Sequence, residues 1–163
     1  LKGIKMDNLR NALYSLEGLT DFLIIDGAPG MNNENNTVIE SVNTIFVVTN
    51  PELPALTDAL KTIKMVETYG KSVKGIILTK TGKRGDMSIE NIESLLGKVV
   101  IADIPEDDKV RDSLIRQDIL VSIYPKNRVA VSYKRLASTL INEVYKEETK
   151  GFIATLISKF RKK

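Results

Sequence analysis

The chain has 163 residues, of which 42% are hydrophobic and 28% charged, which is ordinary for a globular domain large enough to bury a core. It contains no cysteine and no histidine, which excludes disulfides, thiolate metal sites, histidine-ligated zinc and Ser-His-Asp catalysis. Any chemistry must use carboxylates, lysine, arginine, hydroxyls and backbone amides. That set suits phosphate chemistry with Mg²⁺.

The net charge of +3 is unevenly distributed along the chain. Five of the 24 basic residues and no acidic residue lie between Lys150 and Lys163, which leaves 19 basic and 21 acidic residues elsewhere. A mildly acidic body disfavours nucleic acid as a partner, because nucleic-acid binding needs a basic face on the fold. No apolar run is long enough to span a bilayer.

Apolar residues alternate between helical spacing and short continuous runs along the chain. We expect strands at 22–25, 44–49, 73–79 and 99–104, and a short extended piece around Val121. Helices are expected at 6–16, around 38–42 after polar turn residues, at 55–69, 88–96 and 108–116, and, as the longest, at 128–148. Four apolar strands that alternate with helices predict a three-layer α/β fold with a mostly parallel sheet.

Polar residues follow each expected strand at the point where it ends. Asp26 follows the first strand and opens the turn Gly27-Ala28-Pro29-Gly30, while Thr79-Lys80 and Pro105-Glu106-Asp107 follow later strands. Ligands of open parallel sheets bind outside the carboxyl ends of the strands. The sequence therefore predicts a site at this edge, although an ordinary strand end with a capping aspartate explains Asp26 equally well when that stretch is taken alone.

Several stretches together resemble the MinD/ParA family of deviant Walker A P-loop ATPases, and within it archaeal-type MinD, the septum site-determining branch. They are Asp-Phe-Leu-Ile-Ile-Asp-Gly-Ala-Pro-Gly at 21–30, Val-Val-Thr-Asn-Pro-Glu-Leu-Pro at 47–54, Arg-Gly-Asp-Met-Ser-Ile-Glu at 84–90 and Ile-Pro-Glu-Asp-Asp-Lys-Val-Arg-Asp-Ser at 104–113. The resemblance implies ATP and Mg²⁺ as cofactors and a P-loop NTPase-like sheet.

The resemblance also implies roles for individual residues. Asp26 would be the Walker B carboxylate that holds Mg²⁺ through water, and Gly30 would be the switch II glycine whose amide meets the γ-phosphate. Thr79-Lys80 falls where the family carries Asn-Arg for the adenine, so the threonine leaves base selectivity open. Residues 105–107, Pro105, Glu106 and Asp107, would line the base from the far side.

Family members begin with a strand and a glycine-rich phosphate loop, which these 163 residues do not contain. We therefore expect the chain to be the C-terminal portion of such an ATPase, truncated at the N-terminus, with residues 1–149 in the ATPase domain. The missing first strand would lie between the strands at 22–25 and 44–49. The chain by itself is expected to lack hydrolytic activity.

Residues 150–163 are expected to form a separate amphipathic, basic tail helix. Its apolar residues recur at helical spacing, and its basic residues gather at its C-terminal end and beside the apolar face. This is the pattern of a helix that lies in a membrane interface. The apolar set is Phe152, Ile153, Leu156, Ile157 and Phe160, and the basic set is Lys159, Arg161, Lys162 and Lys163. A last helix that packs on its own domain is the alternative.

The resemblance thus implies an ATPase that forms an ATP-dependent homodimer and attaches reversibly to the inner face of the cytoplasmic membrane. Its role would be cell-division site placement or protein positioning, under a regulatory protein that the sequence does not identify. Two alternatives stay open: a catalytically silent membrane-associated scaffold without a P-loop, and a ParA-type partition ATPase. The apolar residues of the basic tail suit lipid better than DNA phosphate.

Overall fold

The computed structural model describes residues 6–16, 18–27 and 33–145 of the chain. Its sheet has three strands, β1 (Ile45–Thr49), β2 (Val73–Thr81) and β3 (Val100–Pro105), in the order β1-β2-β3 with both pairings parallel. Val48 pairs with Ile77, and Thr79 pairs with Ile104. The expected parallel α/β arrangement is confirmed.

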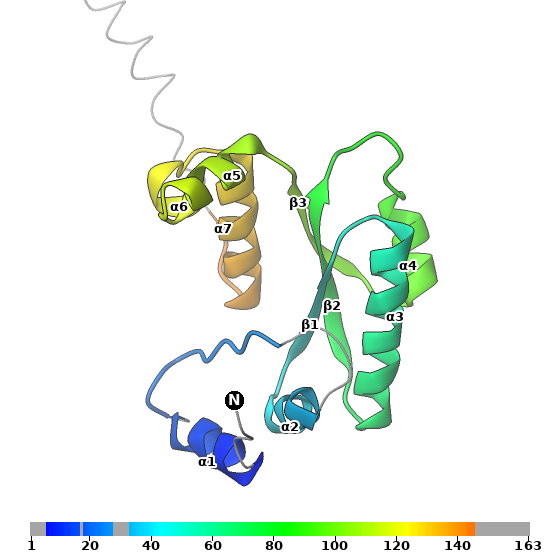
Figure 1. Ribbon diagram of the computed structural model, residues 1–163, viewed down its shortest axis with the longest axis vertical. Coiled ribbons are helices and arrows are strands. Elements are labelled where there is room, and N and C mark those ends of the chain that lie inside the picture. The colour runs from blue at the N-terminus through cyan, green and yellow to red at the C-terminus, as the bar shows by residue number, and fades with distance from the viewer. Residues whose placement is uncertain (1–5, 17, 28–32, 146–163) are drawn as a thin grey trace, which may run out of the picture.

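Helices lie on both sides of this sheet (Figure 1). One side carries α3 (Leu53–Thr68) and α4 (Ile89–Leu96), and the other carries α5 (Asp108–Ile115), α6 (Leu120–Ile123) and α7 (Arg128–Leu140). The remaining two, α1 (Met6–Leu16) and α2 (Asn33–Ser41), contact each other near the amino end of β1. The described residues therefore form three layers, as the strand and helix pattern predicts.

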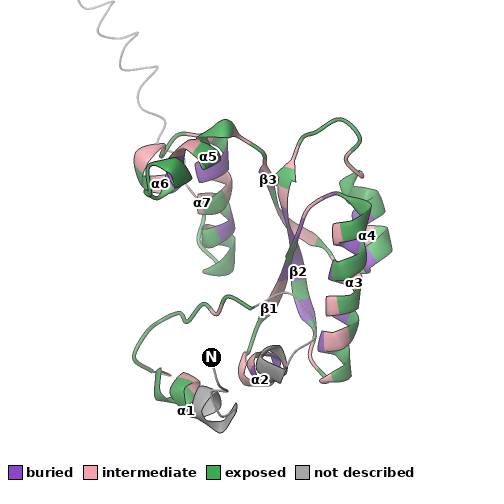
Figure 2. Cartoon of the chain, viewed as in Figure 1, coloured by how far each residue is buried: buried purple, intermediate pink, exposed green. Residues whose placement is uncertain are grey.

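The larger hydrophobic core fills the space between the sheet and the α3–α4 layer. Leu56, Ile63 and Val66 of α3 recur on one helical face and are at most 1% exposed, and they pack against Ile76 of β2 and Ile92 of α4. Figure 2 shows the buried positions concentrated on the strands and on the inner faces of these helices. A smaller cluster on the other face joins Ile77 and Ile104 to α6 and α7.

Local signals set the ends of α4 as expected. The Ser88 side chain accepts a hydrogen bond from the Asn91 amide over 3.3 Å, which caps the first turn. Gly97 ends the helix at a φ of 61°, a left-handed conformation that glycine adopts without steric cost. Sequence and structure agree here because both signals act within one turn of the helix.

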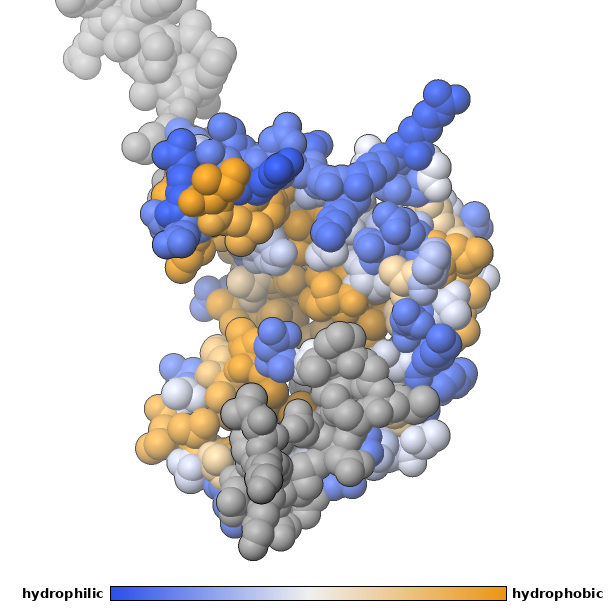
Figure 3. All heavy atoms as spheres, in the orientation of Figure 1, coloured by the Kyte–Doolittle hydropathy of each residue, from blue (hydrophilic) through white to orange (hydrophobic). Residues whose placement is uncertain are grey.

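The expected strand at residues 22–25 is wrong in this structure. Residues 22–27 are irregular, and the side chains of Phe22, Leu23 and Ile24 are 65%, 47% and 89% exposed rather than buried. A strand exists only when a neighbour takes its backbone hydrogen bonds, and none of the described strands pairs with this segment. Figure 3 shows the molecule hollowed on this side, with hydrophobic side chains on the floor of the hollow.

Three smaller expectations also need correction. The piece around Val121 is the helical turn α6 rather than extended, and α2 already begins at Asn33 within the residues expected to be a turn. The last helix ends at Leu140 instead of continuing to residue 148, because Asn142 takes a φ of 56° and its amide and that of Glu143 bond back to Thr139 and Ser138. This is a left-handed helix cap with asparagine in the position that glycine usually takes.

Candidate functional site

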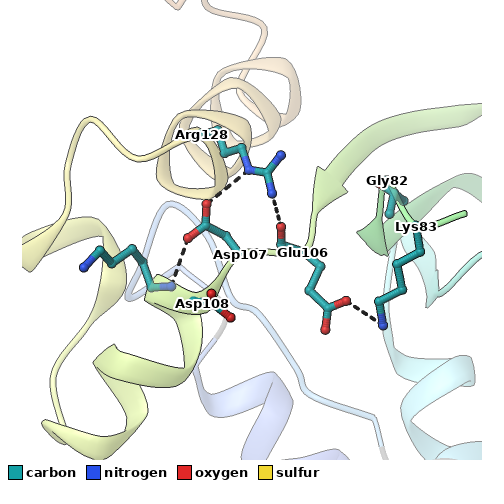
Figure 4. A pocket seen from close by; sticks show the side chains of 8 residues that line it. Gly82, Lys83, Glu106, Asp107, Asp108 and Arg128 are labelled. Carbon is teal, nitrogen blue, oxygen red and sulfur yellow. Dashed lines mark hydrogen bonds and ion pairs between the residues drawn. The ribbon is translucent and has the colours of Figure 1, made fainter.

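An open pocket of about 600 Å³ lies where β2 and β3 end, on the carboxyl edge of the parallel sheet. Its walls come from the loop after β2, the turn after β3 and the first residue of α7 (Figure 4). The lining residues are Thr81, Gly82, Lys83, Glu106, Asp107, Asp108, Lys109 and Arg128. Its volume falls in the range of sites for small molecules and cofactors, and its position is the one that open parallel sheets use for ligands.

The loop after β2 is held in shape by a single carboxylate. Asp86 Oδ2 accepts hydrogen bonds from the amides of Gly82 and Lys83, each 2.8 Å long. Gly82 has a φ of 94°, which a side chain would strain. The loop therefore presents Lys83 to the pocket from a backbone that is fixed at both amides.

The opposite wall is the turn that joins β3 to α5. Asp107 caps α5, since its Oδ1 accepts from the Lys109 amide over 2.9 Å. Across the pocket the Glu106 amide donates to the Thr81 carbonyl over 2.9 Å, and the Glu106 carboxylate pairs with Lys83 Nζ at 2.5 Å. The two walls are therefore joined by a main-chain hydrogen bond and by an ion pair, of which Figure 4 shows the ion pair.

Hydrogen bonds to Asp107 hold the pKa of its carboxyl below the usual value. The Lys109 amide is the largest cause, followed by the Asn127 side chain and then by Arg128. The residues that line the pocket include three carboxylates and three cations, so the formal charges of the lining balance. A balanced polar rim of this kind suits a neutral polar group, such as a base and its sugar, better than it suits a polyphosphate.

Asp26 lies apart from this pocket lining, at the end of the irregular segment 22–27, and its side chain is exposed. Within the described part of the chain no cluster of three or more acidic, histidine or cysteine side chains could hold a metal ion. Mg²⁺ usually takes one or two carboxylates and completes its shell with phosphate and water. One carboxylate at Asp26 fits a metal that arrives with a nucleotide, and Gly30 lies outside the described residues.

Comparison with known proteins decides the family. Residues 35–159 match the model of the family described as 4Fe-4S iron sulfur cluster binding proteins, NifH/frxC family. The chain belongs to the NifH/frxC family. The cluster in that description needs cysteine ligands, and these 163 residues contain none.

Within that family, the relatives that the chain matches are of the MinD/ParA type. It is 31% identical to an ATP-binding protein of Methanocaldococcus jannaschii, over 97% of this chain and 60% of that protein. It is 26% identical to the septum site-determining protein MinD of Bacillus subtilis, over 94% of this chain and 61% of that protein. The family resemblance seen in the sequence is confirmed.

The solved structure of MinD from Pyrococcus horikoshii, a complex with Mg-ADP, matches this fold with a TM-score of 0.76 at 27% identity. The match covers 83% of this chain and 56% of that one. The chain thus spans between half and two thirds of the length of the relatives and the structure named here.

Of the residues that the sequence indicated for the base, Glu106 and Asp107 line the pocket. Pro105 ends β3 just before them, and Thr79 and Lys80 lie within β2, because that strand continues to Thr81. Thr79 Oγ1 donates to the Thr49 carbonyl over 3.2 Å, between β2 and β1. The rim of the pocket therefore begins two residues after the expected position.

Sequence reasoning missed six of the residues that line the pocket. They are Thr81, Gly82, Lys83, Asp108, Lys109 and Arg128. Thr81, Gly82 and Lys83 directly follow the expected end of β2, so a correct end for that strand would have found them, and Asp108 and Lys109 directly follow the expected turn at 105–107. Arg128 is different, since it reaches the wall from a helix that begins 21 positions after Asp107.

The expected tail helix, residues 150–163, lies outside the described residues. No helix of the described part is long and apolar enough to cross a membrane.

Proposed function

We propose that the protein to which this chain belongs is a MinD-like ATPase that binds ATP with Mg²⁺, and that the pocket between β2 and β3 receives the adenine end. The observation that carries the proposal is the position of this polar pocket at the carboxyl edge of a parallel sheet. Support comes from the family, whose members include an ATP-binding protein and a MinD solved with Mg-ADP.

In this proposal the base lies between the two walls of the pocket. Glu106 and Asp107 form one side, and Thr81 to Lys83 form the other, with Thr79, Lys80 and Pro105 supporting these walls from the strands. The balanced charges of the rim suit a neutral base, and the lysines and carboxylates offer donors and acceptors to its ring edge and sugar.

Asp26 is the residue that we assign to the Mg²⁺ shell, through water, and Gly30 is assigned to the γ-phosphate. The metal supplies charge neutralisation for the phosphates when it is bound. Asp26 contributes an exposed carboxylate that can accept hydrogen bonds from metal-bound water. The phosphates themselves need a cradle of backbone amides and a lysine, which the family carries in its glycine-rich loop.

The proposal extends to the family's cycle of ATP-dependent dimerisation and reversible attachment to the cytoplasmic membrane, in cell-division site placement or protein positioning. Attachment would use residues 150–163. Each large apolar side chain contributes up to about 1.5–3 kcal/mol when fully buried, and each basic residue about 1 kcal/mol near an anionic leaflet. One short helix must also be ordered, so two tails on a dimer would bind far better than one.

Nucleotide binding is tested by titrating the chain with ATP·Mg²⁺ and with adenosine, and by comparing two charge reversals. Lys83→Glu replaces the ion pair of the pocket rim with two facing carboxylates, so binding should weaken at least tenfold. Lys61→Glu is the control, because Lys61 forms an exposed pair with Asp58 on α3. Absence of saturable binding, or equal affinity of Lys83→Glu and the unmodified chain, would contradict the proposal.

Turnover and membrane binding have their own tests. The purified chain should not hydrolyse ATP, since loss of even one preorganised donor costs roughly 10²–10³ in rate.

Co-sedimentation with anionic vesicles should retain the full chain better than a version that ends at Glu148 or the variant Ile157→Glu. Equal sedimentation of all three, or equal retention on neutral vesicles, would rule out an electrostatically assisted anchor.

A further inference from the structure

Arg128 is the first residue of α7, and its guanidinium contacts two consecutive residues of the pocket wall. Its Nε donates to Asp107 Oδ2 over 3.1 Å, and its Nη2 donates to the main-chain carbonyl of Glu106. Figure 4 shows the planar fork turned toward both acceptors. One side chain therefore ties the start of α7 to the turn after β3.

Neither helix formation nor burial explains an arginine at this position. A cation in the first turn lies at the positive end of the helix dipole, where acidic residues are the favourable ones. The helix already has its cap, because the Asn127 side chain accepts from the Val129 amide over 2.8 Å. The Arg128 side chain is 62% exposed, so packing contributes little to its placement.

The Glu106–Asp107 turn is otherwise held from the β2 side and by its own helix. The Glu106 amide bonds to Thr81 and the Glu106 carboxylate pairs with Lys83, while Asp107 caps α5 through the Lys109 amide. On the α7 side the Asn127 side chain also hydrogen-bonds Asp107, and Arg128 adds the contact to the Glu106 carbonyl and to the second oxygen of Asp107. Without Arg128, the Glu106 carbonyl loses its support on the α7 side.

We propose that Arg128 is a positioning residue that fixes the Glu106–Asp107 wall against which the base of the nucleotide binds. This inference rests on the proposed function, because it requires the base to occupy this pocket. Its guanidinium acts on the ligand through the wall, so it affects recognition of the base and leaves recognition of the phosphates unchanged. An effect on base recognition alone distinguishes Arg128 from a cation that binds phosphate directly, which would change phosphate recognition as well.

The test is an NMR titration of the isotope-labelled full chain with three probes: ATP·Mg²⁺, adenosine and inorganic tripolyphosphate. Arg128→Ala should weaken ATP and adenosine by about three- to tenfold, the range of one lost hydrogen bond of ordinary strength. Its affinity for tripolyphosphate should be unchanged. Arg128→Lys keeps the charge but loses the planar fork, so it should restore little of the loss.

Arg116→Ala is a matched control that lies outside the pocket. Arg116 Nε donates to Asp112 Oδ2 over 3.0 Å with the side chain 61% exposed, which nearly equals the geometry and exposure of the Arg128 pair. This control should bind all three probes like the unmodified chain. If Arg128→Ala fails to fold, Arg128→Lys provides the same comparison.

The outcomes separate this inference from the proposed function. If the unmodified chain shows no saturable binding of ATP or adenosine, the nucleotide site is wrong, and the inference is overturned with it. If the unmodified chain binds and Arg128→Ala binds adenosine within twofold of it, the positioning role alone is overturned. A loss of tripolyphosphate binding equal to the loss of ATP binding also overturns it, since Arg128 would then contact phosphate.

Discussion

Gly75 on β2 lies directly against the side chain of Ile101 on β3. A Cβ atom added at Gly75 would be 2.5 Å from Ile101 Cγ2 and 3.1 Å from Cγ1. The obstructing atoms belong to a β-branched side chain, which has little freedom to rotate away. Gly75→Ala should therefore destabilise the fold by about 1–3 kcal/mol, the usual cost of overpacking.

A double-mutant cycle in urea checks the Gly75 prediction. Ile101→Ala removes both γ carbons, so Gly75→Ala should cost much less in that background than in the unmodified chain. Equal costs in both backgrounds would show that the contact between Gly75 and Ile101 does not limit packing.

Acid should destabilise the fold partly through Asp107. Because the pKa of Asp107 is lowered from its ordinary value of 3.8, first by the Lys109 amide, the folded state holds this proton less tightly than the unfolded state. The contribution to stability is therefore full above pH 3.8 and is lost as the pH falls through the folded-state pKa. Thermal melts of Asp107→Asn should differ from those of the unmodified chain less at pH 2 than at pH 7. A difference that is independent of pH would contradict this linkage.

The end of α7 depends on the left-handed conformation of Asn142. Asn142→Gly should be neutral or slightly stabilising, because glycine adopts a φ of 56° without strain. Asn142→Val should cost about 1–2 kcal/mol, the penalty that a β-branched L-residue pays in this region. Urea denaturation measures both, and equal stability of the two variants would argue that the helix ends differently.

Exposed apolar side chains at residues 22–24 should limit solubility. Ile24→Lys places a charge on a side chain that is 89% exposed, so it should raise the soluble fraction without changing the melting temperature. Val144→Lys is the control, since Val144 is 83% exposed but stands outside the apolar run. If both variants change solubility equally, general charge rather than this segment is responsible.

Sequence patterns predicted those features that depend on residues close together in the chain. Ser88 and Gly97 mark the ends of α4, and the apolar face of α3 gives its burial. The apolar run at 22–25 led to a wrong strand prediction, because a strand also requires a neighbouring strand, which the run itself cannot reveal. The apolar pattern of the strand at 73–79 did not show that β2 extends to Thr81, where this residue pairs with Pro105.

Part of the pocket lining was beyond sequence reasoning for a similar reason. Glu106 and Asp107 stand at an expected strand end, and their place in the pocket follows from the parallel sheet. Arg128 reaches them from another helix, and nothing in its local sequence marks it for that contact. Contacts of this kind depend on how α7 packs against β3.

The unequal covering of the sheet has a consequence for the order in which the fold opens. Among the described residues, the buried hydrophobic cluster on the α3–α4 side has eleven members, whereas the cluster on the α7 side has six. Local opening is easiest where fewer apolar contacts must break. Amide protons of α6 and α7 should therefore exchange with solvent before those of α3, and the pocket wall attached to Arg128 would open with them.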